Sequence, residues 1–117
     1  GVAFEEVSFK PEWYKFNSRP PKFHKEKCNG IFIKVLDRDS FESVKVGIAL
    51  VWAIKKIHPE KFEWRKETFD RLAGTHDIRL QIDKGEDLQV IFSKWKENLD
   101  KFKVEREKFL LYYTPLY

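Results

Sequence analysis

The residues most capable of chemistry are one cysteine, three histidines and many carboxylates, and their spacings match no familiar catalytic or metal-binding motif. Cys28 has no second cysteine with which to form a disulfide or a CxxC pair. His24 lies four residues before it and is the nearest candidate base. The intervening segment, HKEKCNG, is typical of a polar turn that enters a strand. This context favours a packed thiol over a nucleophile at Cys28.

The other candidate residues have simple structural explanations. The three histidines show neither HxH nor HExxH spacing, no glycine-rich phosphate loop is present, and no serine occupies a nucleophile elbow. Asp37, Asp39 and Glu42 fit turn and capping roles before a helix. Composition and spacing therefore predict no catalytic residues, no metal site and no cofactor, and by themselves they leave the function undetermined.

An apolar helix, predicted over residues 40–57, is the element around which the chain is organised. It contains the most hydrophobic stretch of the sequence, and helical spacing places one apolar stripe along it: Phe41, Val44, Ile48 and Val51. Asp39 and Glu42 have the offset of a capping box, and His58-Pro59 ends the helix. With about a dozen apolar residues the helix is too short for a membrane span, so we expect it in the middle of a domain.

Two strands are predicted before this helix. Residues 2–9 alternate partially, with a slip at Glu5-Glu6 that suggests a bulge. Residues 30–36 are apolar on both faces, which predicts a central strand. The long connection between them carries an unusual number of aromatic side chains, which either pin it to the core or serve function: Trp13, Tyr14, Phe16 and Phe23.

The second half of the chain is predicted to be mostly helical. Residues 62–65 resemble a short strand and residues 69–75 a loop, after which Thr75 caps a helix of about eight residues that Gly85 ends. A long last helix is predicted over residues 86–108. Its apolar positions advance by three and four residues: Leu88, Phe92, Trp95, Leu99, Phe102 and then Arg106. The fold class is therefore α+β, a small sheet packed with a central apolar helix and a long C-terminal helix.

Composition limits the function classes. The chain has 117 residues, 42% of them hydrophobic and 36% charged, which fits one folded domain over residues 1–117. The net charge of +4 arises in the first half, mainly in the segment from Arg19 to Lys27. A solvated loop explains this segment better than a nucleic-acid site does. No methionine is present and nothing near the N-terminus is typical of a signal peptide, so we expect a domain excised from a larger protein.

Four stretches of the sequence carry a family resemblance. They occur in order: VxFxxVxFxP from Val2; CxGIxIxVxDRDxF from Cys28; FEWR from Phe62 with FDRLAGT from Phe69; and SxW from Ser93 followed by KFLLY from Lys108. As an ordered set they resemble the C-terminal domain of the bacterial exo-β-N-acetylmuramidase (NamZ-type) family, over nearly the whole chain. The sequence departs from the family pattern in the long loop before Cys28, at Lys34 and at His76.

The resemblance implies an accessory, cleft-forming domain of a peptidoglycan glycosidase. Its partners would be a preceding Rossmann-like catalytic domain of the same protein and peptidoglycan fragments. The catalytic carboxylates are expected in that preceding domain, so this 117-residue piece alone should be inactive. The resemblance also implies an extracytoplasmic or periplasmic location, and it gives no reason to expect a nucleic-acid partner, a membrane span or a cofactor.

Four residues are the candidates for substrate binding: Trp64, Asp70, Arg71 and Thr75. Aromatic faces stack on sugars, an arginine can clamp a lactyl or peptide carboxylate, and Asp and Thr can bind hydroxyls. Each has a structural alternative, with Trp64 in the core, Asp70 paired with Arg71, and Thr75 as an N-cap. The alternative function is a stand-alone module that binds cell-wall glycan, a protein or nucleic acid, with residues 22–27 available to anionic wall polymers.

Overall fold

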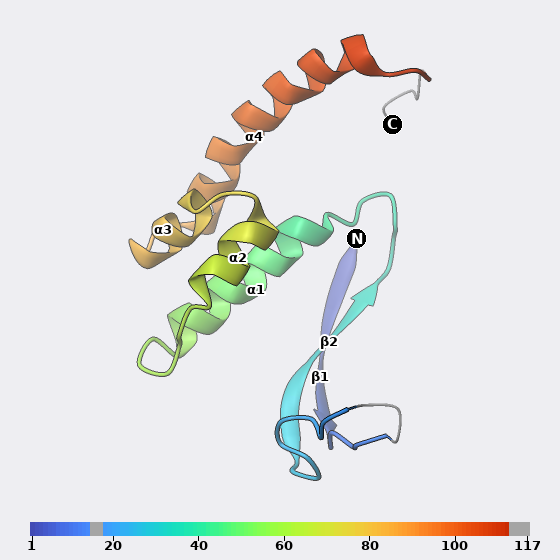
Figure 1. The fold of residues 1–117 in the computed structure, drawn as a ribbon, viewed down its shortest axis with the longest axis vertical. Coiled ribbons are helices and arrows are strands. Elements are labelled where there is room, and N and C mark those ends of the chain that lie inside the picture. The colour runs from blue at the N-terminus through green and yellow to red at the C-terminus, as the bar shows by residue number, and fades with distance from the viewer. Residues whose placement is uncertain (15–17, 113–117) are drawn as a thin grey trace. The chain divides into compact units, whose positions relative to one another are not determined.

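The computed structural model describes residues 1–14 and 18–112. It divides the chain into two compact units, residues 1–43 and residues 44–117. The first unit contains a two-stranded antiparallel sheet and the second contains the helices (Figure 1). The predicted α+β class is confirmed, because the described residues form two strands and four α-helices, the last of which is the longest. The prediction of a single domain is not tested by this division and stays a prediction.

The first unit is built on a β-hairpin. Strand β1 (Val2–Phe9) pairs with strand β2 (Cys28–Val35) in a continuous register from Val2↔Val35 to Phe9↔Cys28. The expected bulge at Glu5-Glu6 is wrong, because both residues have regular partners in β2. The interpretation of β2 as a central strand is also wrong. Within the described residues β2 pairs only with β1, and both faces of its apolar run remain more than half exposed at Ile31 and Phe32.

The connection between the strands contains a tight turn. Phe23 and Lys25 both have positive φ angles, 58° and 63°, which non-glycine residues adopt rarely. Backbone hydrogen bonds fix this turn: Lys25 N–H donates to the carbonyl of Pro11 (2.9 Å) and Glu26 N–H to that of Phe23 (2.9 Å). Of the aromatic residues expected here, Trp13, Tyr14 and Phe23 are exposed, and Phe16 lies outside the described residues.

Helix α1 spans Ser43–Ile57 and begins three residues later than predicted. Asp37 organises the preceding turn, since its carboxylate accepts hydrogen bonds from Asp39 N–H (3.1 Å) and Ser40 Oγ (2.6 Å). The Ser40 hydroxyl and the Asp39 N–H hold the pKa of Asp37 below its ordinary value. The predicted capping box at Asp39 is therefore wrong, because Asp39 lies four residues before the first helical residue.

The middle of the chain is helical where a strand and a loop were predicted. Residues 62–65 form no strand, and α2 (Lys66–Ala73) occupies most of the expected loop. Most residues of α2 are good helix formers. The segment is short, however, and hydrophobic periodicity over so few residues does not distinguish a helix from other structure. Gly74 ends α2 in the left-handed conformation (φ 75°) that glycine adopts readily.

Two further helices complete the second unit. Helix α3 spans Asp77–Asp83, and Gly85 follows it with a φ of 73°, as expected for a helix stop. Helix α4 spans Leu88–Arg106 and continues into a 3₁₀ turn at Glu107–Phe109. The side chain of Asp87 caps α4 by accepting a hydrogen bond from Gln89 N–H (2.8 Å). None of the helices in the described ranges combines the length and apolar character required to cross a bilayer.

Four isoleucines form the core of the second unit. Ile48 of α1, Ile78 and Ile82 of α3, and Ile91 of α4 are each at most 6% exposed. Larger side chains surround them: Trp52, Trp64, Phe69, Ala73, Leu88, Phe92 and Trp95. The inner stripe predicted for the last helix is confirmed in its first half. The prediction did not include Ile91, which is the most buried residue. It is wrong at Phe102, which is 57% exposed because α4 extends past the core.

Candidate functional site

Trp64, the first of the four candidate residues, is held by its neighbours. Its indole N–H donates to Asp83 Oδ1 (2.7 Å), and its ring packs against Phe62 and Phe69 with centroid separations of 4.7 Å in both cases. The ammonium of Lys55 lies 5.4 Å from the indole centroid and also bonds Asp83. These contacts give Trp64 a structural role at the edge of the core.

Asp70 is paired with Arg79 rather than with Arg71. The guanidinium of Arg79 donates from Nε (2.8 Å) and from its terminal nitrogen (2.7 Å) to the two carboxylate oxygens of Asp70, a bidentate geometry. These hydrogen bonds hold the pKa of Asp70 below its ordinary value and raise the pKa of Arg79. Both side chains therefore stay charged near neutral pH.

Asp83 connects Trp64 and Asp70 through one polar network. Its second carboxylate oxygen lies 3.9 Å from the guanidinium of Arg79. Partial burial raises the pKa of Asp83, but the hydrogen bonds from Lys55 and Trp64 lower it more, so the net shift is downward. A glycosidase general acid needs a raised pKa. Neither Asp70 nor Asp83 has that property, and both act here as ionised anchors between α1, α2 and α3.

Arg71 and Thr75 are placed differently. Arg71 is exposed on α2, and its guanidinium has no ion pair or hydrogen bond with any part of the chain that the structure describes. Thr75 lies two residues before α3, and its hydroxyl oxygen accepts a hydrogen bond from Asp77 N–H (3.1 Å). The predicted N-cap at Thr75 is wrong by one residue, because His76 occupies the N-cap position. Trp64 and Asp70 thus belong to one network, whereas Arg71 lies outside it and Thr75 borders a groove.

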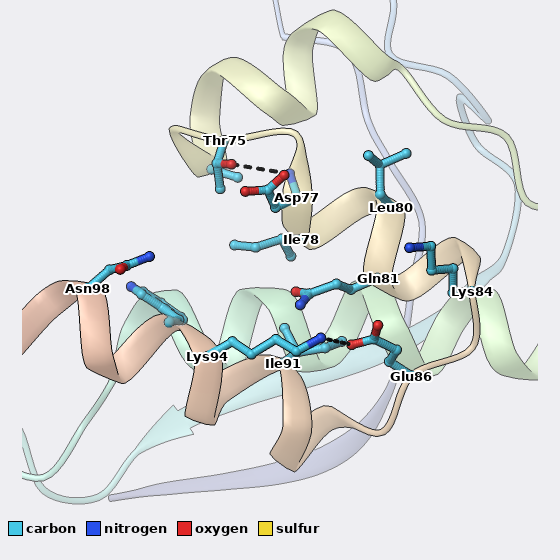
Figure 2. Close-up of a pocket in the computed structure, with 12 residues that line it drawn as sticks. Thr75, Asp77, Ile78, Leu80, Gln81, Lys84, Glu86, Ile91, Lys94 and Asn98 are labelled. Atoms are coloured by element: carbon cyan, nitrogen blue, oxygen red, sulfur yellow. Dashed lines mark hydrogen bonds and ion pairs between the residues drawn. The ribbon is translucent and has the colours of Figure 1, made fainter.

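This groove is a concave surface of the helical unit with a volume of about 480 Å³. Figure 2 shows side chains of α3 and α4 facing each other across it, with Thr75 and Asp77 at one end. Its lining residues are Ala73, Thr75, Asp77, Ile78, Leu80, Gln81, Lys84, Glu86, Ile91, Lys94, Trp95 and Asn98. The volume falls within the range of about 300–1,000 Å³ typical of small-molecule sites.

Helical periodicity explains how these side chains come together. One face of α3 carries Asp77 and Gln81, which are four residues apart. Lys84 follows three residues later at the C-terminal end of α3 and lies on the same side. On α4, Ile91 is followed at the same spacing by Trp95 and Asn98. Thr75 is the only one of the four candidates in the groove. Gln81 and Asn98 were missed because single amides at helical spacing form no motif, and Trp95 was assigned only to the core.

Within the described residues, no group of three or more His, Cys, Asp or Glu side chains is arranged to hold a metal ion. His24 is distinctive for another reason, because its Nδ1 is buried without a hydrogen-bond partner. His24 lies between Phe23 and Lys25, the two residues with positive φ. No donor among the described residues bonds its Nδ1, and Cys28 Sγ instead donates to the carbonyl of Glu26 at 3.7 Å.

Comparison with known proteins identifies the family. The family model described as "Exo-beta-N-acetylmuramidase NamZ, C-terminal" matches residues 1–112. The chain belongs to the NamZ C-terminal family. One curated relative, the peptidoglycan beta-N-acetylmuramidase NamZ of Bacillus subtilis (strain 168), is 34% identical over 113 residues, which is 96% of this chain. The match covers only 26% of that relative, so the NamZ-family chain described here spans about a quarter of its length. No solved structure matches.

Proposed function

We propose that this chain is an accessory domain of a peptidoglycan exo-β-N-acetylmuramidase. One observation carries the proposal: nearly the entire chain matches the C-terminal family of such enzymes, while about three quarters of the relative's length lies outside the match. The bond-breaking groups would then belong to a preceding Rossmann-like domain of the same protein, and peptidoglycan fragments would be the substrate.

The electrostatics of the helical unit support an accessory rather than a catalytic role. Glycoside hydrolysis requires a carboxylic acid that is protonated near neutral pH beside a second carboxylate or an equivalent group. The carboxylates of Asp70 and Asp83 have lowered pKa values and are committed to Arg79, Lys55 and Trp64. The domain would contribute by lining the substrate cleft and excluding water from it.

For substrate contact we retain the four candidates Trp64, Asp70, Arg71 and Thr75 as a proposal, with Arg71 foremost. Its guanidinium is exposed and unpaired within the described residues, so it can donate two hydrogen bonds to a lactyl or peptide carboxylate. Trp64 and Asp70 would act mainly by shaping the adjacent surface, since their polar groups already have partners.

A side-by-side glycosidase assay tests the proposed function. A chromogenic N-acetylmuramic acid glycoside is offered to this 117-residue chain and to the full-length gene product. We expect hydrolysis by the full-length protein only, because the catalytic groups lie elsewhere. Hydrolysis by the 117-residue chain would contradict the accessory role and direct attention to Asp37, Asp39 and Asp70. Activity in neither would favour a stand-alone binding module.

The role of Arg71 has its own test in the full-length protein. Arg71→Ala should raise KM about tenfold or more for a muramic acid substrate that carries a peptide stem, with a smaller change in kcat, because a charge-assisted hydrogen bond is lost. Arg65→Ala is the matched control, since Arg65 is also exposed and its side chain has no ion pair or hydrogen bond within residues 1–14 and 18–112. Equal KM values for the two variants would remove Arg71 from the binding surface.

A further inference from the structure

We propose that the groove between α3 and α4 is a binding subsite for an N-acetylated amino-sugar residue of a glycan strand. This inference rests on the proposed function for the choice of glycan, and it adds a site and a ligand chemistry to it. The proposed ligand-contacting residues are Trp95, Gln81, Asn98 and Thr75. They line the groove together with the buried Ile78 and Ile91.

The base of the groove is apolar. Ile78 and Ile91 are 6% and 1% exposed and belong to the core cluster, and Trp95 packs beside them with its ring 6.2 Å from that of Phe92. These side chains are fixed by the core, so the surface is formed before any ligand arrives. An apolar base of this kind suits the C–H face of a pyranose ring or the methyl group of an acetamide.

Polar side chains with unused hydrogen-bonding groups surround this apolar base. The side-chain amides of Gln81 and Asn98 and the indole N–H of Trp95 have no hydrogen-bond partner in the described residues. The polar side-chain atoms of Gln81 and Trp95 are not buried, since Nδ1 of His24 is the only buried side-chain nitrogen or oxygen without a partner among the partly buried and buried residues described. Asn98 is itself an exposed residue. Amides both donate and accept, which matches the mixed donors and acceptors of sugar hydroxyls and an acetamido group.

The charged residues that line the groove balance one another. The groove holds two acidic residues, Asp77 and Glu86, and two basic residues, Lys84 and Lys94. Lys94 Nζ donates to Glu86 at 2.9 Å, and Figure 2 shows the Lys94 side chain extending from α4 to Glu86 in the connection between α3 and α4. The formal charges cancel, so the groove has no excess to attract a polyanion such as nucleic acid or a phosphate-rich wall polymer. A neutral sugar with its apolar face and acetamide fits this surface better.

The experiment is a titration of the uniformly ¹⁵N-labelled 117-residue chain followed by ¹H–¹⁵N NMR. The probe is the β-1,4-linked trisaccharide of N-acetylglucosamine, and the ligand control is the β-1,4-linked glucose trisaccharide, which lacks the acetamido groups. We expect the Trp95 indole signal, assigned with Trp95→Phe, and the Gln81 and Asn98 side-chain signals to shift with the first probe. The glucose trisaccharide should bind at least fivefold more weakly.

Two variants distinguish a site from a general surface effect. Gln81→Ala combined with Asn98→Ala should weaken binding about tenfold, because both lost amides face the ligand. Gln89→Ala is the matched control, since Gln89 is an exposed amide of α4 outside the groove, and it should bind within twofold of the unmodified chain. Neither change removes a core side chain, so the folded spectrum should be retained.

The results separate this inference from the proposed function. Shifts confined to other regions, equal binding of both trisaccharides, or unchanged binding by the double variant would each overturn the groove assignment. Shifts produced by an isolated stem peptide but not by the sugar would replace it with a peptide site. None of these outcomes changes the result of the full-length glycosidase assay. If that assay shows no hydrolysis, the reason for choosing a peptidoglycan sugar is lost, but the measured binding of the trisaccharide still stands.

Discussion

The charged side chains of Asp70 and Arg79 form a close ion pair in the helical unit. Asp70 receives two hydrogen bonds from Arg79, whose side chain is only 13% exposed. Removing one member of such a pair leaves the other without its partner, which costs more than the pair itself contributes. The same residue that was considered for substrate contact therefore has a measurable structural role.

Asp70→Asn tests that role through its pH dependence. The folded pKa of Asp70 lies below its ordinary value of 3.8 because Arg79 stabilises the carboxylate. Its contribution to stability is therefore present above about pH 4 and is lost as the pH falls through the folded pKa. At pH 7 we expect a Tm several degrees below that of the unmodified chain, with the difference shrinking below about pH 4.

Thermal melts followed by circular dichroism between pH 2 and pH 7 measure this effect. Asp100→Asn is the control, because Asp100 is exposed on α4 and forms no ion pair or hydrogen bond through its side chain within the described residues. A difference in Tm between Asp70→Asn and the unmodified chain that stayed constant across this range would show that the carboxylate charge is not what stabilises the fold.

Ile91 is the most buried of the four core isoleucines. It is 1% exposed and lies among isoleucines from two other helices. Ile91→Ala should lower the free energy of unfolding by about 2–5 kcal/mol, because it removes buried methyl groups and leaves a cavity. Chemical denaturation measures the change. Val104→Ala, at a position 64% exposed on the same helix, should cost less than about 1 kcal/mol.

At the scale of elements, two glycines should respond in opposite ways to the same substitution. Gly47 lies inside α1, and a Cβ added there would meet nothing within 4 Å. Gly74 ends α2 with a φ of 75°, where a Cβ would also find open space. Gly47→Ala should stabilise the protein by about 0.5–1 kcal/mol and Gly74→Ala should destabilise it by about 1 kcal/mol.

The two glycine variants control for each other. The added methyl group meets open space at both positions, and the two sites differ in backbone conformation, which is helical at Gly47 and left-handed at Gly74. Denaturant midpoints give the two free energies. If Gly74→Ala were neutral or stabilising, the left-handed C-cap of α2 would not be required for its end. If Gly47→Ala were destabilising, the surface of α1 at that position would be occupied by other groups.

At the scale of the whole molecule, the helical unit contains its own core. All four buried isoleucines and the side chains around them lie within residues 48–95. A chain restricted to residues 43–112 should therefore keep its helical circular dichroism and unfold cooperatively. The same chain with Ile91→Ala is the control and should lose that cooperativity. Non-cooperative melting of the shorter chain itself would show that the first unit is needed for the helical core to form.

The sequence alone determined the family, the α+β class and the main helices. An ordered set of motifs over nearly the full chain pointed to the NamZ-type C-terminal domain, and the family match over residues 1–112 agrees. Long periodic segments such as α1 and α4 were found because burial of one helical face demands apolar residues at every third or fourth position. The helix stops at Gly74 and Gly85 depend on local backbone conformation, and only Gly85 was assigned that role.

Only the tertiary structure decided which partners the polar residues have. Asp70 accepts hydrogen bonds from Arg79, nine residues away, and not from its neighbour Arg71. Trp64 donates a hydrogen bond to Asp83, 19 residues later in the chain. The groove that brings Thr75 together with Gln81 and Asn98 has no sequence signature. Hydrogen bonds and cavities depend on distances between elements that are far apart in the chain, and local periodicity contains no information about those distances.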